Sequence, residues 1–153
     1  MKKIFVGILA VGLLGFAFTT ATPKNEIKIE KSETAVGIQF FHGTWTEALA
    51  KAKKENKLIF LDAYASWCGP CKAMAKNTFT NEEVGAFFNK NFINMKMDME
   101  KSTEGPRLSK KFGLRAYPSL YFVNGNEEIK HNGLGYMKPT QLIELGKVAL
   151  TKK

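Results

Sequence analysis

The feature that most constrains the fold is an apolar run, Leu58 to Ala65, that leads directly into the two cysteines of the chain. The run reads LIFLDAYA and is followed by SWCGPCKAM. A strand that is apolar on both faces must be covered on both faces, as in the sheets of α/β proteins. The sequence therefore predicts a central strand at 58–65 and a helix that begins at the cysteines. Asp62 is the one acid in this run, and we expect it to be buried.

Two further helices are indicated by capping boxes, in which a hydroxyl side chain and a glutamate three positions later satisfy each other's backbone N–H groups. Thr44 and Glu47 have this spacing, and the apolar period that follows predicts an amphipathic helix over 45–56. Thr80 and Glu83 repeat the spacing and predict a second helix.

Alternation of side chains predicts the remaining strands. Residues 92–99 place Ile93 and three methionines on one side, and methionine is a common core filler, so we expect core packing rather than a soft copper(I) site. After a helix over 104–113, the pair Asn124-Gly125 predicts a tight hairpin turn, because both residues tolerate positive φ.

Pro139 suits the first position of a closing helix. The order α–β–α–α–β–α–β–β–α then predicts an α/β fold, with parallel strands from the alternating part and an antiparallel hairpin. We expect a central mixed sheet with helices on both faces.

The first residues resemble a targeting segment. MKK is a positive start, Ile4 to Phe18 is an apolar run, and small residues follow, as in a cleaved secretory signal peptide at 1–21. A retained anchor fits less well, since a spanning helix needs about 20 apolar residues. We expect an N-terminal extension at 22–43, with a candidate edge strand near its end, and one domain at 44–153. The expected location is the periplasm or cell envelope, as a soluble protein after cleavage.

The chain is basic, with 23 basic and 14 acidic side chains and a net charge of +9. Loss of residues 1–21 would remove two lysines and leave +7. The lysines are scattered and lie beside glutamates on predicted helix faces, which favours a solvated surface over a nucleic-acid partner.

The cysteines allow three interpretations: a structural staple, half of a zinc site, or a redox pair. A disulfide across three positions removes little entropy from the unfolded chain. Zinc needs about four ligands, and the other candidates are His42 and His131, at no useful spacing. We therefore expect no metal and no cofactor, and favour dithiol chemistry.

The helix N-terminus supports that chemistry. Its unpaired N–H groups and dipole favour thiolate, and can lower a cysteine pKa to about 7 from about 8.5 in such motifs. Cys68 lies at the N-terminus of this helix and is the expected nucleophile. Cys71, one turn inside, is placed to resolve a mixed disulfide, and Pro70 fits the first turn.

WCGPC after a buried strand carrying Asp62, with AYPS before a hairpin, resembles thioredoxin over about residues 44–151. Residues 44–74 and 98–123 are similar to exported thioredoxin-like proteins, which include the C-terminal domain of bacterial membrane thiol:disulfide interchange reductases. The resemblance implies the thioredoxin fold.

The resemblance also implies roles for single residues. Asp62 matches the buried acid that relays a proton to or from the second cysteine, and Pro118 matches the cis-proline beside which a substrate strand pairs. The implied substrate-binding residues are Trp67, Gly69, Pro70, Tyr117 and Pro118.

Two positions depart from thioredoxin. Tyr64 replaces its second tryptophan, and Tyr117 precedes the proline where thioredoxin has a small or aliphatic residue. A longer loop from Asp98 to Arg107 leaves open whether Lys96 matches the lysine that pairs with the acid.

The expected function is that of an exported thiol:disulfide reductase, a monomer with disulfide-containing clients and a membrane electron donor. Gly-Pro between the cysteines accompanies a potential near about −270 mV in thioredoxin, against about −120 mV in a strong oxidant. The alternatives are a disulfide oxidase or isomerase in protein folding, and a binding module that uses the fold as a scaffold.

Overall fold

The computed structural model describes residues 36–153. The predicted signal peptide and most of the N-terminal extension lie outside these residues. Within them the chain forms five helices and four strands. In order, these are α1 (Trp45–Glu55), β1 (Leu58–Tyr64), α2 (Gly69–Asn77), α3 (Glu82–Asn91), β2 (Phe92–Asp98), α4 (Gly105–Phe112), β3 (Ser119–Val123), β4 (Ile129–Leu134) and α5 (Pro139–Leu150). The order is the predicted one. None of these described helices is long and apolar enough to cross a membrane.

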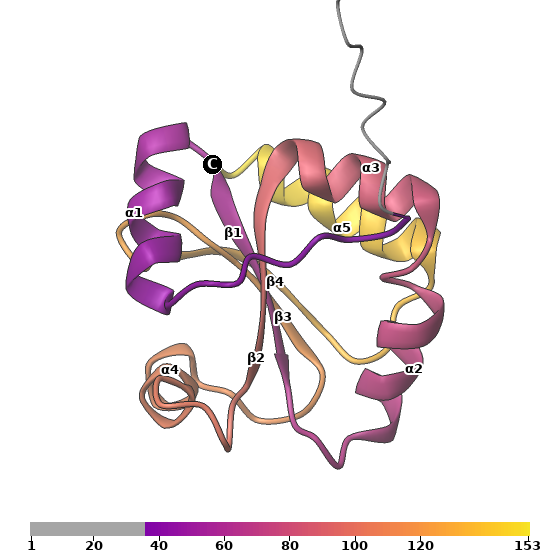
Figure 1. Cartoon of the computed structure of the whole chain (residues 1–153), viewed down its shortest axis with the longest axis horizontal. Coiled ribbons are helices and arrows are strands. Elements are labelled where there is room, and N and C mark those ends of the chain that lie inside the picture. Colours follow the sequence, from indigo (N-terminus) through magenta and orange to yellow (C-terminus); the bar gives the residue numbers. More distant parts are fainter. Residues whose placement is uncertain (1–35) are drawn as a thin grey trace, which may run out of the picture. The chain divides into compact units, whose positions relative to one another are not determined.

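The strands form one mixed sheet in the order β2-β1-β3-β4. β1 pairs in parallel with β2 and antiparallel with β3, so the apolar strand predicted at the centre is hydrogen-bonded on both sides. β3 and β4 form the predicted antiparallel hairpin. The fold class is confirmed: a thioredoxin fold with helices on both faces of a mixed sheet (Figure 1).

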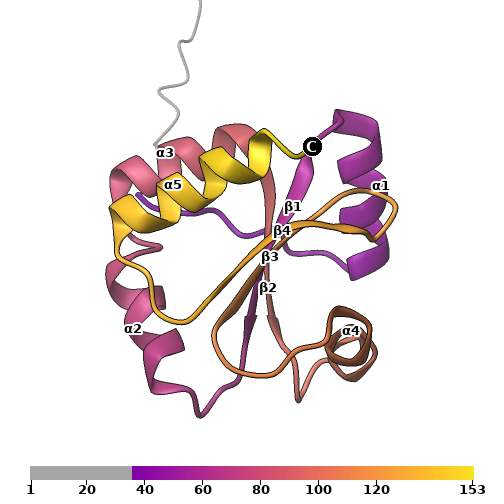
Figure 2. The ribbon, with the colours of Figure 1, turned by 180° about the vertical axis from the view of Figure 1, so that it is seen from behind.

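Alternating side chains of β1 face two separate cores. Ile59, Leu61 and Ala63 pack with residues of α1 and α4, whereas Leu58 and Phe60 pack with residues of α2, α3 and α5. Figures 1 and 2 show α1 and α4 on one side of the sheet and the other three helices on the opposite side. The methionines of β2 are buried in the first core, as the alternation predicts.

One predicted cap is confirmed and one is wrong. The Thr44 backbone N–H donates to Glu47 over 2.7 Å, and the Glu47 N–H donates to the Thr44 hydroxyl over 3.2 Å. At the N-terminus of α3, however, Asn81 is the N-cap, and its Oδ1 accepts from the Val84 N–H at 3.1 Å. The Thr80 hydroxyl instead donates to the Lys76 carbonyl at the end of α2, over 2.6 Å.

The predicted two-residue turn at Asn124-Gly125 is also wrong. The loop is longer, with Asn124 N–H donating to Glu128 O over 3.0 Å, and Glu127 is the residue with positive φ, at 63°. Gly125 is needed for a different reason: a Cβ there would come within 2.3 Å of Cγ of Lys53 on α1. The glycine lets the hairpin tip lie against the first helix.

The candidate edge strand near residue 40 is not part of the four-stranded sheet of the described residues. The segment lies beside β2 and makes one backbone hydrogen bond to it, from Phe41 N–H to Asn94 O over 2.7 Å. Side chains supply its other hydrogen bonds to β2 and α3.

Glu127 joins three elements at the hairpin tip. Its carboxylate accepts from the Trp45 indole at 2.5 Å, from Lys111 at 2.5 Å, and from both terminal nitrogens of Arg107 at 2.6 and 3.1 Å. These hydrogen bonds, with that of Arg107 as the largest cause, lower the pKa of Glu127 to about 2. The contacts fix the hairpin against α1 and α4.

Glu127→Gln is therefore expected to lower the free energy of unfolding by about 1–2 kcal/mol at pH 7, a modest value because Arg107 and Lys111 are half exposed. A carboxylate whose pKa is lowered by folding stabilises the fold above its unfolded pKa, and this contribution is lost as pH falls towards the folded pKa. The difference between the variant and the wild type should thus shrink between pH 4.5 and about pH 2 in urea titrations. Glu128→Gln, at the adjacent position, is the matched control, and an equal loss there would contradict the assignment.

Candidate functional site

The two cysteines form a disulfide at the first turn of α2. Their Cα atoms are 5.3 Å apart, and both residues are buried against Ala65, with Tyr64 and Tyr117 packed around them. Gly69 and Pro70 lie between them in the first turn, and a Cβ on Gly69 would meet nothing within 4 Å. The surface at Gly69, next to the buried disulfide, is therefore unobstructed.

Cys68 is the N-cap of α2. Its Sγ accepts a hydrogen bond from the Cys71 backbone N–H at 3.1 Å, so this sulfur lies where the helix N–H groups and the helix dipole stabilise negative charge. Cys71 is one turn inside the helix. This is the arrangement that the motif predicts, with one sulfur suited to thiolate and the other behind it.

Asp62 lies on β1 beneath the disulfide. It is 2% exposed, and its Oδ1 has no hydrogen-bond partner among the described residues. Burial raises the pKa of Asp62 to about 7, against the opposing effect of Lys96. Asp62 and Cys71 line one cavity of about 230 Å³, so an acid whose pKa is raised towards neutral pH shares a cavity with the second cysteine.

The sequence leaves open whether Lys96 pairs with this acid. In the structure Lys96 lies next to Asp62, on the adjacent strand β2. It is the register partner of Asp62 in the parallel β1–β2 pair, and it lines the same cavity. The two side chains make no ion pair within 4.0 Å in the described part of the chain. The Lys96 ammonium instead lies over the ring of Tyr64, 4.8 Å from its centroid.

The Tyr117–Pro118 peptide bond is cis, at the position that the resemblance implies. The Pro118 carbonyl accepts from the Gly135 N–H at 2.8 Å, which places residues 134–136 beside the proline. Gly135 has φ of 84°, a conformation that favours glycine. Its neighbours Leu134 and Tyr136 are exposed apolar side chains.

A groove of about 550 Å³ lies next to the disulfide, lined by Trp67, Tyr117 and residues 114–116. Trp67 is 66% exposed, yet its orientation is fixed. Its indole N–H donates to Glu100 over 2.9 Å, and its ring meets that of Tyr117 edge-on with centroids 5.7 Å apart. An exposed aromatic residue held in one orientation is suited to contact another protein.

The structure thus brings the predicted residues Cys68, Cys71, Trp67, Tyr117 and Pro118 to one end of the sheet, with Asp62 below. Sequence reasoning missed two groups that lie with them. Glu100 belongs to the loop after β2, and its spacing carries no signal. Residues 134–136 comprise the last residue of β4 and the two that follow it, and an apolar pair around a glycine was the one clue that the sequence offered.

Comparison with known proteins agrees with this geometry. Residues 41–125 match the family described as thioredoxin-like. Thioredoxin H2-1 of Oryza sativa subsp. japonica is 32% identical over 116 residues, which cover 76% of this chain and 79% of the rice protein.

Two solved structures are also similar. A candidate disulphide isomerase from Bacteroides thetaiotaomicron superposes with a TM-score of 0.68 at 39% identity, covering 78% of this chain and 98% of that one. The oxidised C-terminal domain of DsbD from Neisseria meningitidis gives a TM-score of 0.59 at 28% identity, covering 72% and 99%. With its fold, its cysteine pair and these relatives, the chain belongs to the thioredoxin-like family of disulfide oxidoreductases.

Proposed function

We propose that this protein is an exported thiol:disulfide reductase that reduces disulfides in other proteins through Cys68 and Cys71. The observation that carries the proposal is a disulfide at the N-terminus of α2, next to the unobstructed Gly69, with the buried carboxyl of Asp62, whose Oδ1 has no hydrogen-bond partner among the described residues, behind it. The similarity of residues 1–21 to a signal peptide supports export, and the similarity to the C-terminal domain of DsbD supports the reducing direction.

The reaction begins with the reduced pair. The Cys68 thiolate attacks one sulfur of a client disulfide, forming a mixed disulfide and releasing the other client sulfur as a thiolate. Cys71 then gives its proton to the Asp62 carboxylate, and its sulfur attacks Sγ of Cys68. The second client sulfur leaves and takes up a proton, so two electrons pass to the client and the pair ends as the Cys68–Cys71 disulfide.

The groove beside Trp67 is the proposed client site. Trp67 and Tyr117 supply aromatic surface next to the reacting sulfur, and Leu134 and Tyr136 extend it past Pro118. Such a surface accepts extended chains of varied sequence, which suits a reductase with several clients. Gly69 and Pro70, which follow Cys68 in the first turn of α2, are proposed to contact the client beside this groove.

Each turnover consumes two electrons, so the oxidised pair must be reduced again. In an oxidising compartment the donor must bring electrons across the membrane, and a membrane-bound dithiol protein is the chemical class that can exchange directly with Cys68. We expect such a donor to dock on the same open face as the clients.

The reduction potential tests the direction. Equilibration of the protein with glutathione or dithiothreitol is expected to give a value near about −250 mV or lower. Insulin reduction with dithiothreitol as the electron source checks the activity itself. A potential above about −180 mV would contradict the reductase and favour the second candidate.

That second candidate is a disulfide isomerase or oxidase. The observation that favours it is the 39% identity to the Bacteroides thetaiotaomicron protein described as a candidate disulphide isomerase. Refolding of a scrambled disulfide protein distinguishes the two: an isomerase restores native pairing without net reduction.

A further inference from the structure

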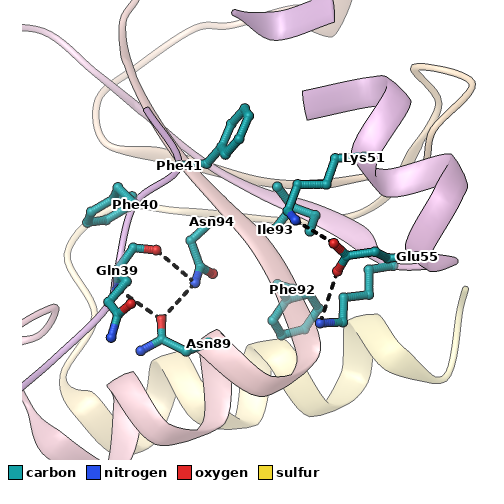
Figure 3. Close-up of a pocket in the computed structure, with 10 residues that line it drawn as sticks. Gln39, Phe40, Phe41, Lys51, Glu55, Asn89, Phe92, Ile93 and Asn94 are labelled. Carbon is teal, nitrogen blue, oxygen red and sulfur yellow. Dashed lines mark hydrogen bonds and ion pairs between the residues drawn. The ribbon is translucent and has the colours of Figure 1, made fainter. Parts of the chain in front are cut away.

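Residues 37–41, here called the strap, lie beside β2 and are held to it and to α3 by the side-chain amides of the buried Asn94 and the half-buried Asn89 (Figure 3). The Asn89 Oδ1 accepts from the Gln39 N–H at 2.9 Å and from Asn94 Nδ2 at 3.0 Å. Asn94 Nδ2 also donates to Gln39 O over 3.3 Å. The strap is therefore held in one place by side chains of two elements.

A second set of hydrogen bonds holds the first residues of the strap. The Gly37 carbonyl accepts from Asn89 Nδ2 at 3.0 Å, and Ile38 N–H donates to Phe79 O over 2.7 Å. A Cβ on Gly85 of α3 would lie 2.4 Å from the Gly37 carbonyl carbon. Two glycines thus allow the strap to approach the helix at backbone contact distance.

The fastened strap presents two phenylalanine rings to opposite sides (Figure 3). Phe41 packs against the core under α1 and α4. Phe40 packs edge-on against Phe79, with centroids 5.5 Å apart, and its ring lies 5.6 Å from Nζ of Lys96. The Lys96 ammonium is therefore flanked by two rings, Phe40 from the strap and Tyr64 from β1.

Lys96 lines the same cavity as Asp62 and Cys71. The other titratable or charged groups of the cavity are Tyr64 from β1 and Lys72 from α2, while Asp98 of β2 acts on Tyr64. Lys96 forms no ion pair within the described residues, so the two rings are its specific attractive contacts. Cations within about 6 Å of a ring centroid are held electrostatically by the ring.

We propose that Phe40 is a positioning residue of the redox site: with Tyr64 it holds the Lys96 ammonium beside Asp62, and so the strap adjusts the proton affinity of that acid. Without the Phe40 ring, Lys96 turns further into water and its attraction for the ionised carboxyl weakens. The contact is supplied by a segment outside the Cys-Gly-Pro-Cys motif, its strand and its helix.

The test is a titration of the Asp62 carboxyl by ¹³C NMR in the oxidised protein. Phe40→Leu is expected to raise the pKa of Asp62 by a few tenths of a unit and at most by about half a unit, because the energy of an exposed cation–π contact limits how strongly the ring holds Lys96 in place. Lys96→Met should raise the pKa of Asp62 at least as far. Phe40→Leu combined with Lys96→Met should raise this pKa no further than Lys96→Met alone. Phe40→Tyr keeps a ring and should retain the wild-type titration.

Phe41→Leu is the matched control, because it removes the neighbouring ring from the same strap without touching Lys96. Equal shifts in Phe40→Leu and Phe41→Leu would overturn the proposal, as would a Phe40→Leu shift that persists in the Lys96→Met background. If Phe40→Leu does not fold, the wild-type protein still decides. The Hε protons of Lys96 must show nuclear Overhauser contacts to the ring protons of Phe40, and their absence overturns the proposal.

A kinetic consequence rests on the proposed function: at pH 7, Phe40→Leu should slow the attack of Cys71 on the mixed disulfide about twofold, since less Asp62 is ionised. The titration does not need turnover. If Phe40→Leu raises the pKa of Asp62 as expected but the wild-type protein reduces no disulfide, the proposed function is refuted and this inference stands.

Discussion

Cys68→Ser is expected to abolish disulfide reduction, with insulin turnover falling to the rate of dithiothreitol alone. The reason is chemical, because the reaction requires a thiolate and a serine hydroxyl at neutral pH supplies almost no alkoxide. The hydrogen bond from the Cys71 N–H, together with the helix dipole, stabilises charge at position 68 in particular. Loss of the sulfur at this cap therefore removes the first step.

Cys71→Ser is the matched control for that variant. It keeps the nucleophile and removes the sulfur that resolves the mixed disulfide, so it should accumulate a covalent adduct with client protein on non-reducing gels. The reverse pattern, with adducts from Cys68→Ser and none from Cys71→Ser, would mean that the second cysteine attacks. Full turnover by Cys68→Ser would refute the dithiol mechanism.

Local patterns predict the fold wherever a residue's environment follows from its neighbours in sequence. The run from Leu58 to Tyr64 is apolar on both faces, and the structure places it at the sheet centre with a core on either side. The capping box at Thr44 succeeds for the same reason, since both of its partners lie within one turn.

The errors arise where a distant element decides the local conformation. Asn124-Gly125 has the composition of a tight turn, but Gly125 is required by contact with Lys53 on α1, and the loop is longer. Thr80 has capping-box spacing, yet its hydroxyl bonds back to α2 and the adjacent Asn81 caps α3. Spacing alone does not distinguish these cases.

The same division applies to the candidate site. The sequence motif includes both cysteines and Asp62, because chemistry restricts the residue types allowed there. Glu100, which orients Trp67, and Phe40, which flanks Lys96, act only through contacts across the fold. No pattern within one segment predicts such contacts, since each depends on where a loop or strap passes another element.

Asp62→Asn is expected to change the pH dependence of stability. Burial raises the pKa of Asp62 from 3.8 to about 7, so the folded protein binds a proton that the unfolded chain has already lost. An acid whose pKa is raised by folding favours the fold below its unfolded pKa, and this stabilisation is lost as pH rises through the folded pKa. Between pH 4 and pH 8 the free energy of unfolding of the wild type should therefore fall by on the order of 4 kcal/mol relative to that of Asp62→Asn.

Urea unfolding of the oxidised proteins at pH 4 and pH 8 measures this difference directly. Asn matches the shape of the neutral acid, so the two proteins should be similar at pH 4 and the variant more stable at pH 8. Asp98→Asn, on the neighbouring strand, keeps the buried acid and should follow the wild type. If the free energy of unfolding changes with pH in the same way in the wild type and in Asp62→Asn, the Asp62 carboxyl does not have the raised pKa that its burial predicts. A buried acid that destabilises the folded protein at working pH is explained by the proposed mechanism, in which the ionised Asp62 accepts the proton of Cys71.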